Sequence, residues 1–460
     1  MRHRNRSRSE FGRRGSTRGG KRLGTTLSGS QTVQTLGCNI FILVLNMATS
    51  FMLSRALGPG GRGEVAAAML WPPLFVYLFG LGITSSVVFF AASSGFQSKV
   101  LASASALALV QGLAGAAIGF FLLPLLLASQ HANVVAAGRV YLLVVPISLV
   151  TLCATGVLQG SRRILAFNGV RLIVPGGYLA GALVLVFLHV VTPLTIVLLH
   201  LLLNLATLSA CVVALGAVLR QADFRPSLAY VKRLVRYGVK VQLGDTSQLA
   251  NLRLDQVLMA AWLRPRELGL YVVAVNASSL VSLVSTAVRM VSVPSIAQLE
   301  GSGARMSLVG STFREYWIVS LFGTLVLAIL LPYALPVFFG SPFSPAVAPA
   351  EVLLVASFAL GAKDVLSGAA QALGDPWLGS RAELVSLPVT VVLLFVLIPR
   401  DGIMGAAISS LAAYATQLAV TVVGFRVRHG LATADLLLPN RRDLAALRRS
   451  WLHVLLGRGA

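Results

Sequence analysis

The sequence predicts an all-α, polytopic membrane protein with about 12 transmembrane helices in two pseudo-symmetric six-helix lobes. Three observations lead to this fold class. Of the 460 residues, 56% are hydrophobic and only 12% are charged, against roughly a quarter charged in soluble proteins. The mean hydropathy is +0.82, and long apolar runs recur throughout the chain. Too few charges remain to cover a soluble enzyme or to keep a disordered chain in solution.

Each predicted helix is an apolar stretch close to the roughly 20 residues that span a bilayer. The stretches are 32–54, 65–92, 101–127, 139–159, 172–189, 194–219, 241–262, 269–296, 316–338, 349–371, 382–399 and 402–425. We therefore predict five regions: a tail (1–31), an N-terminal lobe (32–219), a linker (220–240), a C-terminal lobe (241–425) and a second tail (426–460).

Basic residues predict the orientation of the helices. With both tails cytoplasmic, the inner segments hold about five times as many Lys and Arg as the outer loops, as cytoplasmic membrane faces do. We expect a multi-pass cell-membrane protein whose basic tails touch anionic lipid headgroups, and not a nucleic-acid-binding protein. The composition of tail 1–31 favours disorder.

An internal repeat relates the two predicted halves. The hairpins 57–63 and 263–269 share three residue types at an offset of 206, namely Leu57, Pro59 and Gly63 against Leu263, Pro265 and Gly269. A second set recurs at an offset of 212 and lines one helix face in each half: Thr151, Thr155 and Gln159 against Lys363, Ser367 and Gln371. Duplicated halves of equal orientation are typical of transporters.

Charged residues within the predicted spans are concentrated in the C-terminal half. A charge in hydrocarbon faces a cavity or a partner. Asp245 and Asp255 lie on a polar stripe of span 241–262 and, with Asp364, are candidates for binding a coupling proton or Na⁺. Alternatively, these acids belong to a structural network in which they pair with other residues of the protein. Lys363 is either an anion ligand or the partner of Asp245 or Asp255, and Arg289 either lines a cavity or snorkels.

The N-terminal half offers mainly neutral polar groups. Asn39 and Asn46 share a face of the first span and suit either sugar hydroxyls or helix–helix hydrogen bonds. Arg171 lies at the inner mouth of the fifth span. The sequence contains no Walker loop, HExxH motif or nucleotide-binding glycine loop, so we expect neither an enzyme nor a cofactor, apart from a coupling Na⁺ or H⁺.

Several short motifs occur in a recognisable order. The first span ends in residues 53–59 (LSRALGP) and is followed by Gly63; residues 158–163 (LQGSRR), Tyr237-Gly238 ahead of Asp255, and residues 267–271 (ELGLY) come later. This order resembles the polysaccharide flippases of the multidrug/oligosaccharidyl-lipid/polysaccharide exporter superfamily, over about residues 30–425.

The resemblance implies a V-shaped exporter fold that moves undecaprenyl-diphosphate-linked oligosaccharide outward by ion-coupled alternating access. It implies a cationic cavity, for which Arg55, Arg253, Arg289 and Lys363 are candidates, with Arg171 at the rim and Asn39, Asn46, Gln159 and Gln371 as polar candidates. Glycan-assembly enzymes are expected partners. Two alternatives are a multidrug or cation antiporter, whose first helix often carries an acid where this chain has asparagines, and a membrane-embedded glycan polymerase or ligase.

Overall fold

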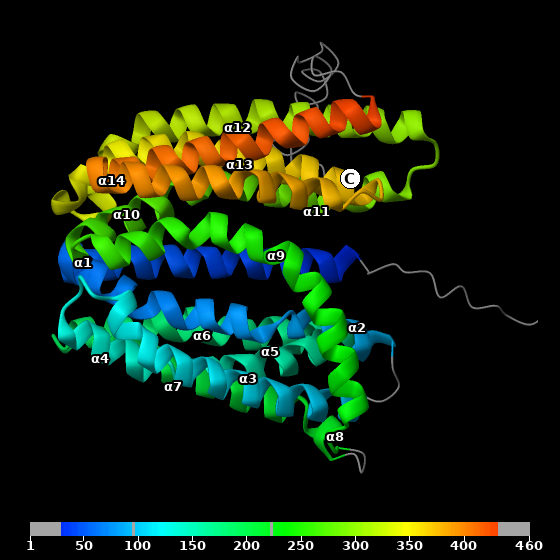
Figure 1. Cartoon of the computed structure of the whole chain (residues 1–460), viewed down its shortest axis with the longest axis horizontal. Coiled ribbons are helices and arrows are strands. Elements are labelled where there is room, and N and C mark those ends of the chain that lie inside the picture. Colours follow the sequence, from blue (N-terminus) through cyan, green and yellow to red (C-terminus); the bar gives the residue numbers. More distant parts are fainter. Residues whose placement is uncertain (1–28, 94–96, 221–223, 431–460) are drawn as a thin grey trace, which may run out of the picture.

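The computed structural model describes residues 29–93, 97–220 and 224–430. Most of both predicted tails, 1–28 and 431–460, therefore lies outside the described residues. Within the described ranges the chain forms helices and short connections, with no strand. Figure 1 shows the helices running side by side in two bundles, with α9 passing from one to the other.

The N-terminal lobe contains helices α1 to α8. Their bounds are α1 (Gly29–Gly80), α2 (Ile83–Ser93), α3 (Gln97–Leu126), α4 (Ala132–Tyr141), α5 (Val144–Gly160), α6 (Ile164–Phe187), α7 (Pro193–Ala214) and α8 (Gly216–Leu219). The rest of the described chain forms α9 (Leu228–Trp262), α10 (Pro265–Ser278), η1 (Ser279–Val281), α11 (Ser282–Gln298), α12 (Ser302–Phe339), η2 (Ser341–Ala346), α13 (Val347–Ala372) and α14 (Trp377–His429).

The predicted all-α membrane fold is confirmed. Nine helical stretches in the described ranges are long and apolar enough to span a bilayer. Two of them are pairs of helices joined at a kink, at Gly58 (φ 65°) in α1 and Gly402 (φ 54°) in α14. Only glycine adopts such angles without strain. When the two helices on either side of each kink are counted separately, the described ranges contain eleven apolar spans. The more polar α9, 35 residues long, is the twelfth.

Three helix boundaries differ from the sequence prediction. The predicted span 65–92 begins earlier, at the Gly58 kink, and breaks at Leu81 and Gly82, which both have positive φ. The span 139–159 is preceded by α4 and interrupted between Tyr141 and Val144. The predicted span 241–262 begins earlier, because α9 starts at Leu228, within the predicted linker 220–240.

Two ends of the molecule are distinguished by the turns they carry. We call the end with the kinks at Gly58 and Gly402 the hairpin end, and the end where the described chain starts and stops the tail end. One hydrophobic core, including Ala67, Leu268 and Phe339, joins both lobes towards the hairpin end. Further cores around Leu149 and Leu366 belong to single lobes. The lobes are therefore closed at the hairpin end.

Helix α9 belongs to both lobes. Its first half packs on the N-terminal lobe, where Leu234 is buried and its carbonyl accepts a hydrogen bond of 2.9 Å from the Ser86 hydroxyl. Its second half contacts the C-terminal lobe, where the amide of Asn251 donates to the Glu383 carbonyl at 3.1 Å. The segment between these anchors is thus the covalent and helical connection of the two lobes.

Candidate functional site

Adjoining cavities lie between the two lobes. The first, of about 240 Å³, is lined from the N-terminal lobe by α1 and α6 and from the C-terminal lobe by α10, η1 and α12. The second, of about 390 Å³, lies between the second segment of α1 and α9. Both are lined by Arg62 and Tyr178. We call them together the central cavity and separately the amide compartment and the apolar compartment.

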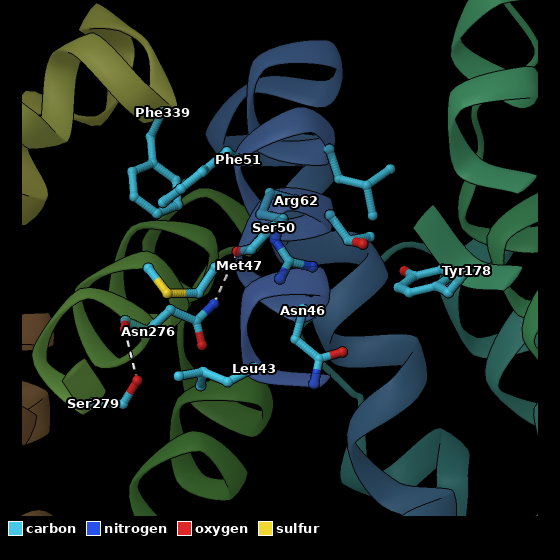
Figure 2. Close-up of a pocket in the computed structure, with 12 residues that line it drawn as sticks. Leu43, Asn46, Met47, Ser50, Phe51, Arg62, Tyr178, Asn276, Ser279 and Phe339 are labelled. Carbon is cyan, nitrogen blue, oxygen red and sulfur yellow. Dashed lines mark hydrogen bonds between the residues drawn. The ribbon is translucent and has the colours of Figure 1, made fainter. Parts of the chain in front are cut away.

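Arg62 is the charged group common to both compartments. It lies just after the Gly58 kink on α1, and Figure 2 shows it among the residues that line the amide compartment. Its Nε is buried and has no hydrogen-bond partner in the part of the chain that the structure describes. A guanidinium with a buried, unpaired donor is costly in a membrane. Arg62 is therefore suited to an anionic ligand.

Arg253 of α9 is the second cation of the central cavity. It lines the apolar compartment, and its Nη1 donates a hydrogen bond of 3.0 Å to the Gln256 side chain. Among the side chains that the structure describes, no Asp or Glu lines either compartment. The described wall therefore carries two positive charges, which favours phosphate-like anions.

A third cavity continues the series towards the tail end. It has a volume of about 330 Å³ and shares Pro73 and Tyr77 with the apolar compartment. Gln242 lies on its wall and donates to the Tyr77 carbonyl at 3.0 Å. The cavities thus follow the second segment of α1 from the hairpin end to the break at Gly82.

The duplicated hairpins meet each other at the hairpin end. A Cβ placed on Gly63 would lie 1.6 Å from the carbonyl oxygen of Pro265, and one placed on Gly269 would lie 2.0 Å from that of Pro59. The four residues form two equivalent contacts, since Pro265 and Gly269 repeat Pro59 and Gly63 at the offset of 206. We call this backbone contact the hairpin seam.

Side chains flanking the hairpin seam bind carbonyls at helix ends. Arg55 donates to the carbonyls of Val337 and Phe338 near the end of α12, the latter at 3.0 Å. Gln130, after α3, donates to those of Ala260 and Leu263 at 3.0 and 3.2 Å. Carbonyls in the last helical turn lack intrahelical donors, so these side chains hold the lobes together. Arg55 thus lies at the seam and not among the lining residues of the central cavity.

Lys363 lies in a buried ion pair. Its ammonium contacts the carboxylate of Glu383 on α14 and lies 3.5 Å from Asp364. Glu383 also accepts from the Asn251 side-chain nitrogen at 3.0 Å, and the Thr390 hydroxyl donates to the Asn251 side-chain oxygen Oδ1 at 2.7 Å. Lys363 does not line the three cavities. Among the described side chains its partner is Glu383 and not Asp255.

Asp255 is buried on α9 without an ion pair in the described ranges. One carboxylate oxygen accepts a hydrogen bond of 2.7 Å from the Gln256 backbone, and the other accepts one of 2.5 Å from the Tyr271 hydroxyl. Tyr271 in turn lies 3.4 Å from the Ser410 hydroxyl. The side chain of Asp245, the neighbouring candidate, lies outside the described residues.

The remaining predicted site residues are dispersed. Asn46 lines the amide compartment, whereas Asn39 accepts a hydrogen bond of 2.8 Å from Arg171 between α1 and α6. Arg289 lies against Gly368 within the C-terminal lobe. Gln159 and Gln371 are exposed at the tail end of α5 and α13. Of the sequence candidates whose side chains the structure describes, Asn46 and Arg253 line the central cavity.

Two residues of evident importance were not among the sequence candidates. Arg62 lies in the segment assigned to the first hairpin loop, and its position three residues before an Ala-rich apolar run gives no sign that it faces inward. Glu383 lies in the predicted span 382–399 but was not counted with its intramembrane charges. An acid so close to the start of an apolar stretch is a signal that could have identified it.

Comparison with known proteins decides the family. The family model described as "Polysaccharide biosynthesis protein" matches residues 30–300, more than half of the chain. The chain belongs to this polysaccharide biosynthesis protein family. A search of curated proteins gives no match. The family assignment agrees with the resemblance stated from the sequence motifs.

Solved structures share the fold of this polysaccharide biosynthesis family member. The lipid II flippase MurJ in an inward closed conformation is 12% identical, with a TM-score of 0.73 over 93% of this chain and 94% of its own. An inward-facing MATE family multidrug transporter of the MOP superfamily is 13% identical, with a TM-score of 0.69 over 89% and 96%.

An outward-facing MATE family transporter is less similar in shape. It is 16% identical and has a TM-score of 0.58 over 87% of this chain and 94% of its own. The polysaccharide biosynthesis family member therefore has the exporter fold, with its two lobes in contact at the hairpin end.

Proposed function

We propose that this chain is a flippase for lipid-linked oligosaccharide in cell-surface glycan biosynthesis, with the substrate diphosphate bound between Arg62 and Arg253. The observation that carries the proposal is Arg62, whose guanidinium Nε is buried without a hydrogen-bond partner among the described residues, in a cavity that Arg253 also lines. Membership of the polysaccharide biosynthesis family and the fold shared with a lipid II flippase support the substrate class.

The proposal includes a direction of transport. Most basic residues lie in segments of the tail end, so the positive-inside rule makes this end cytoplasmic. The hairpin seam then closes the outer side of the cell membrane, and the lobes rock to open either end in turn. Glycan-assembly enzymes that supply the substrate at the cytoplasmic face are proposed partners. The two arginines on the cavity wall favour an anionic substrate over the cationic drugs of an antiporter.

Neutralising either cavity arginine is expected to stop flipping. With the gene deleted, surface glycan should be lost and lipid-linked precursor should accumulate facing the cytoplasm. Arg62→Gln or Arg253→Gln should then restore less than about a tenth of the wild-type glycan, because each removes charge-assisted hydrogen bonds worth roughly 1.5–3 kcal/mol. Surface glycan and membrane protein level are measured together.

The matched control for these variants is Arg266→Gln. Arg266 is exposed at the hairpin end and does not line the central cavity, so this variant should restore normal glycan. Full restoration by the Arg62→Gln, Arg253→Gln double variant would refute the proposed diphosphate site. Unchanged glycan in the deletion strain, with new sensitivity to cationic drugs, would refute the flippase itself.

We further propose Asp255 as the residue that binds the coupling H⁺ or Na⁺. It is a buried carboxylate on the helix that connects the lobes, without an ion pair among described residues, and such a group in a membrane protein binds a proton or a cation. Asp364 is partly compensated by Lys363, which makes it the weaker candidate.

Asp255→Asn should uncouple transport from the ion gradient. The amide keeps the shape and the hydrogen bond with Tyr271 but cannot release a proton or balance Na⁺. In proteoliposomes, collapsing the pH or Na⁺ gradient should slow wild-type flipping and leave the slower flipping of the variant unchanged. Asp401→Asn, at an exposed acid near the Gly402 kink, is the control and should retain the gradient dependence.

A further inference from the structure

We infer that the amide compartment binds the first sugar of the substrate, the one joined to the diphosphate, through the side-chain amides of Asn46 and Asn276. This inference rests on the proposed flippase function. It adds the positions of the sugar, the diphosphate and the lipid chain along the cavity, and a basis for sugar selectivity. Figure 2 shows the two asparagines, one from each lobe, in the compartment that also contains Arg62 and Tyr178.

Most hydroxyl groups of the amide compartment are already hydrogen-bonded within the protein. Thr49 donates to the Leu45 carbonyl at 2.8 Å, and Ser279 donates to the Asn276 carbonyl at 2.7 Å. Ser50 accepts from the Asn276 amide nitrogen at 3.0 Å, a bond that joins the two lobes. These groups fix the wall of the compartment and leave few atoms for a ligand.

The polar atoms left over suit a neutral, hydroxyl-rich ligand. Asn46 is exposed to the cavity, and its amide has no hydrogen bond among the described residues. The Asn276 side-chain oxygen, whose nitrogen is held by Ser50, can accept a further bond. Two amides and the Tyr178 hydroxyl thus present both donors and acceptors. Phe51 and Phe339 add an apolar surface of the kind on which a sugar ring packs.

The arrangement of charge gives the orientation of the substrate. Arg62 lines both compartments, so a phosphate bound to it touches both. On one side the apolar compartment contains Arg253 together with Val65, Met69, Leu70, Leu74 and Val272. A second phosphate and the start of a lipid chain fit this side. The group on the other side of the diphosphate is the first sugar, and it meets the amides.

The size of the amide compartment limits how much of the substrate it can enclose and recognise. Its volume of about 240 Å³ is below the roughly 300–1,000 Å³ of pockets that enclose drug-sized ligands. One sugar ring fits such a space, and a complete repeat unit does not. We therefore infer that these residues select the first sugar, while later sugars make fewer contacts with the described cavity.

The experiment measures binding of short-chain probes to the full chain in lipid nanodiscs. The probes are geranyl diphosphate and the same diphosphate carrying one glucose, galactose or N-acetylglucosamine. We expect at least one sugar-bearing probe to bind the wild type more tightly than bare geranyl diphosphate. Asn46→Ala should weaken that probe about tenfold, as the loss of one or two hydrogen bonds implies, and should leave bare geranyl diphosphate unchanged.

Matched variants separate this inference from the proposed function. Asn133→Ala makes the same change outside the central cavity and should alter no affinity, whereas Arg62→Gln should weaken every probe. If Asn46→Ala weakens all probes alike, or if no sugar improves wild-type binding, the sugar site is wrong and the flippase stands. If Arg62→Gln leaves geranyl diphosphate binding unchanged, the proposed diphosphate site fails first.

Discussion

Alanine at Gly63 is expected to prevent closure of the hairpin end and thereby to abolish flipping. A Cβ at this position would lie 1.6 Å from the carbonyl oxygen of Pro265, far inside van der Waals contact. The obstacle is backbone on a hairpin, so no side-chain rotation relieves it. Gly269→Ala should act in the same way, since its Cβ would lie 2.0 Å from the Pro59 carbonyl.

The opened state can be detected by thiol labelling. With Cys38, Cys153 and Cys211 replaced by alanine, a single cysteine is introduced as Ser279→Cys in the amide compartment. A membrane-impermeant thiol reagent added to the hairpin side should label it slowly in the parent and at least about tenfold faster in Gly63→Ala, in line with an energy difference above 1.4 kcal/mol.

The same hairpin provides the control for this prediction. Gly60 has open space where a Cβ would be added, so Gly60→Ala should leave both labelling and flipping as in the parent. Slow labelling together with normal flipping in Gly63→Ala would show that the hairpin seam does not close the outer side.

Removing the carboxylate of Glu383 is expected to cause the largest loss of stability. Glu383→Gln leaves the buried Lys363 ammonium with only the half-buried Asp364 carboxylate, at 3.5 Å, as a counter-charge, and breaking one partner of a buried pair costs about 3–5 kcal/mol. Thermal unfolding of the purified protein in detergent should therefore shift to a markedly lower temperature. Glu351→Gln, at a half-buried acid earlier on α13, should change it little.

A double variant distinguishes an ion pair from simple loss of packing. Lys363→Met removes the buried charge while keeping a long side chain, so Lys363→Met combined with Glu383→Gln should be more stable than Glu383→Gln alone. If the losses of stability caused by the two single substitutions simply add in the double variant, the two charges do not stabilise each other. In that case Lys363 would again become a candidate for binding substrate.

The sequence predicted the helices better than their contacts. Apolar length placed all twelve spans, because burial in lipid requires long uninterrupted runs. The break at Leu81 and Gly82 was missed because the residues around it are apolar, and the early start of α9 because charged residues such as Lys232 and Arg233 favour a loop in hydropathy. Hydropathy averaged over about 20 residues reports composition. It therefore shows neither a backbone break among apolar residues nor a helix that begins with charged residues.

The candidate site was predicted only in part for a related reason. Spacing along one helix shows which residues share a face, and so it identified the exposed amide of Asn46. It does not show which helix lies opposite. Lys363 is neutralised by Glu383 from α14, and Arg62 reaches the cavity only because the Gly58 kink starts a new helix before it.

The hairpin seam also bears on how a two-lobed chain of this kind arises. Each half contributes the same Pro and Gly, and each glycine meets the other half's proline carbonyl. A contact of this form is self-complementary, as in twofold-symmetric dimers. A six-helix protein with one such hairpin could therefore associate with its own copy through the same residues before gene duplication. After fusion, a substitution in either hairpin alters one side of an inherited dimer interface, so the two hairpins are expected to evolve together.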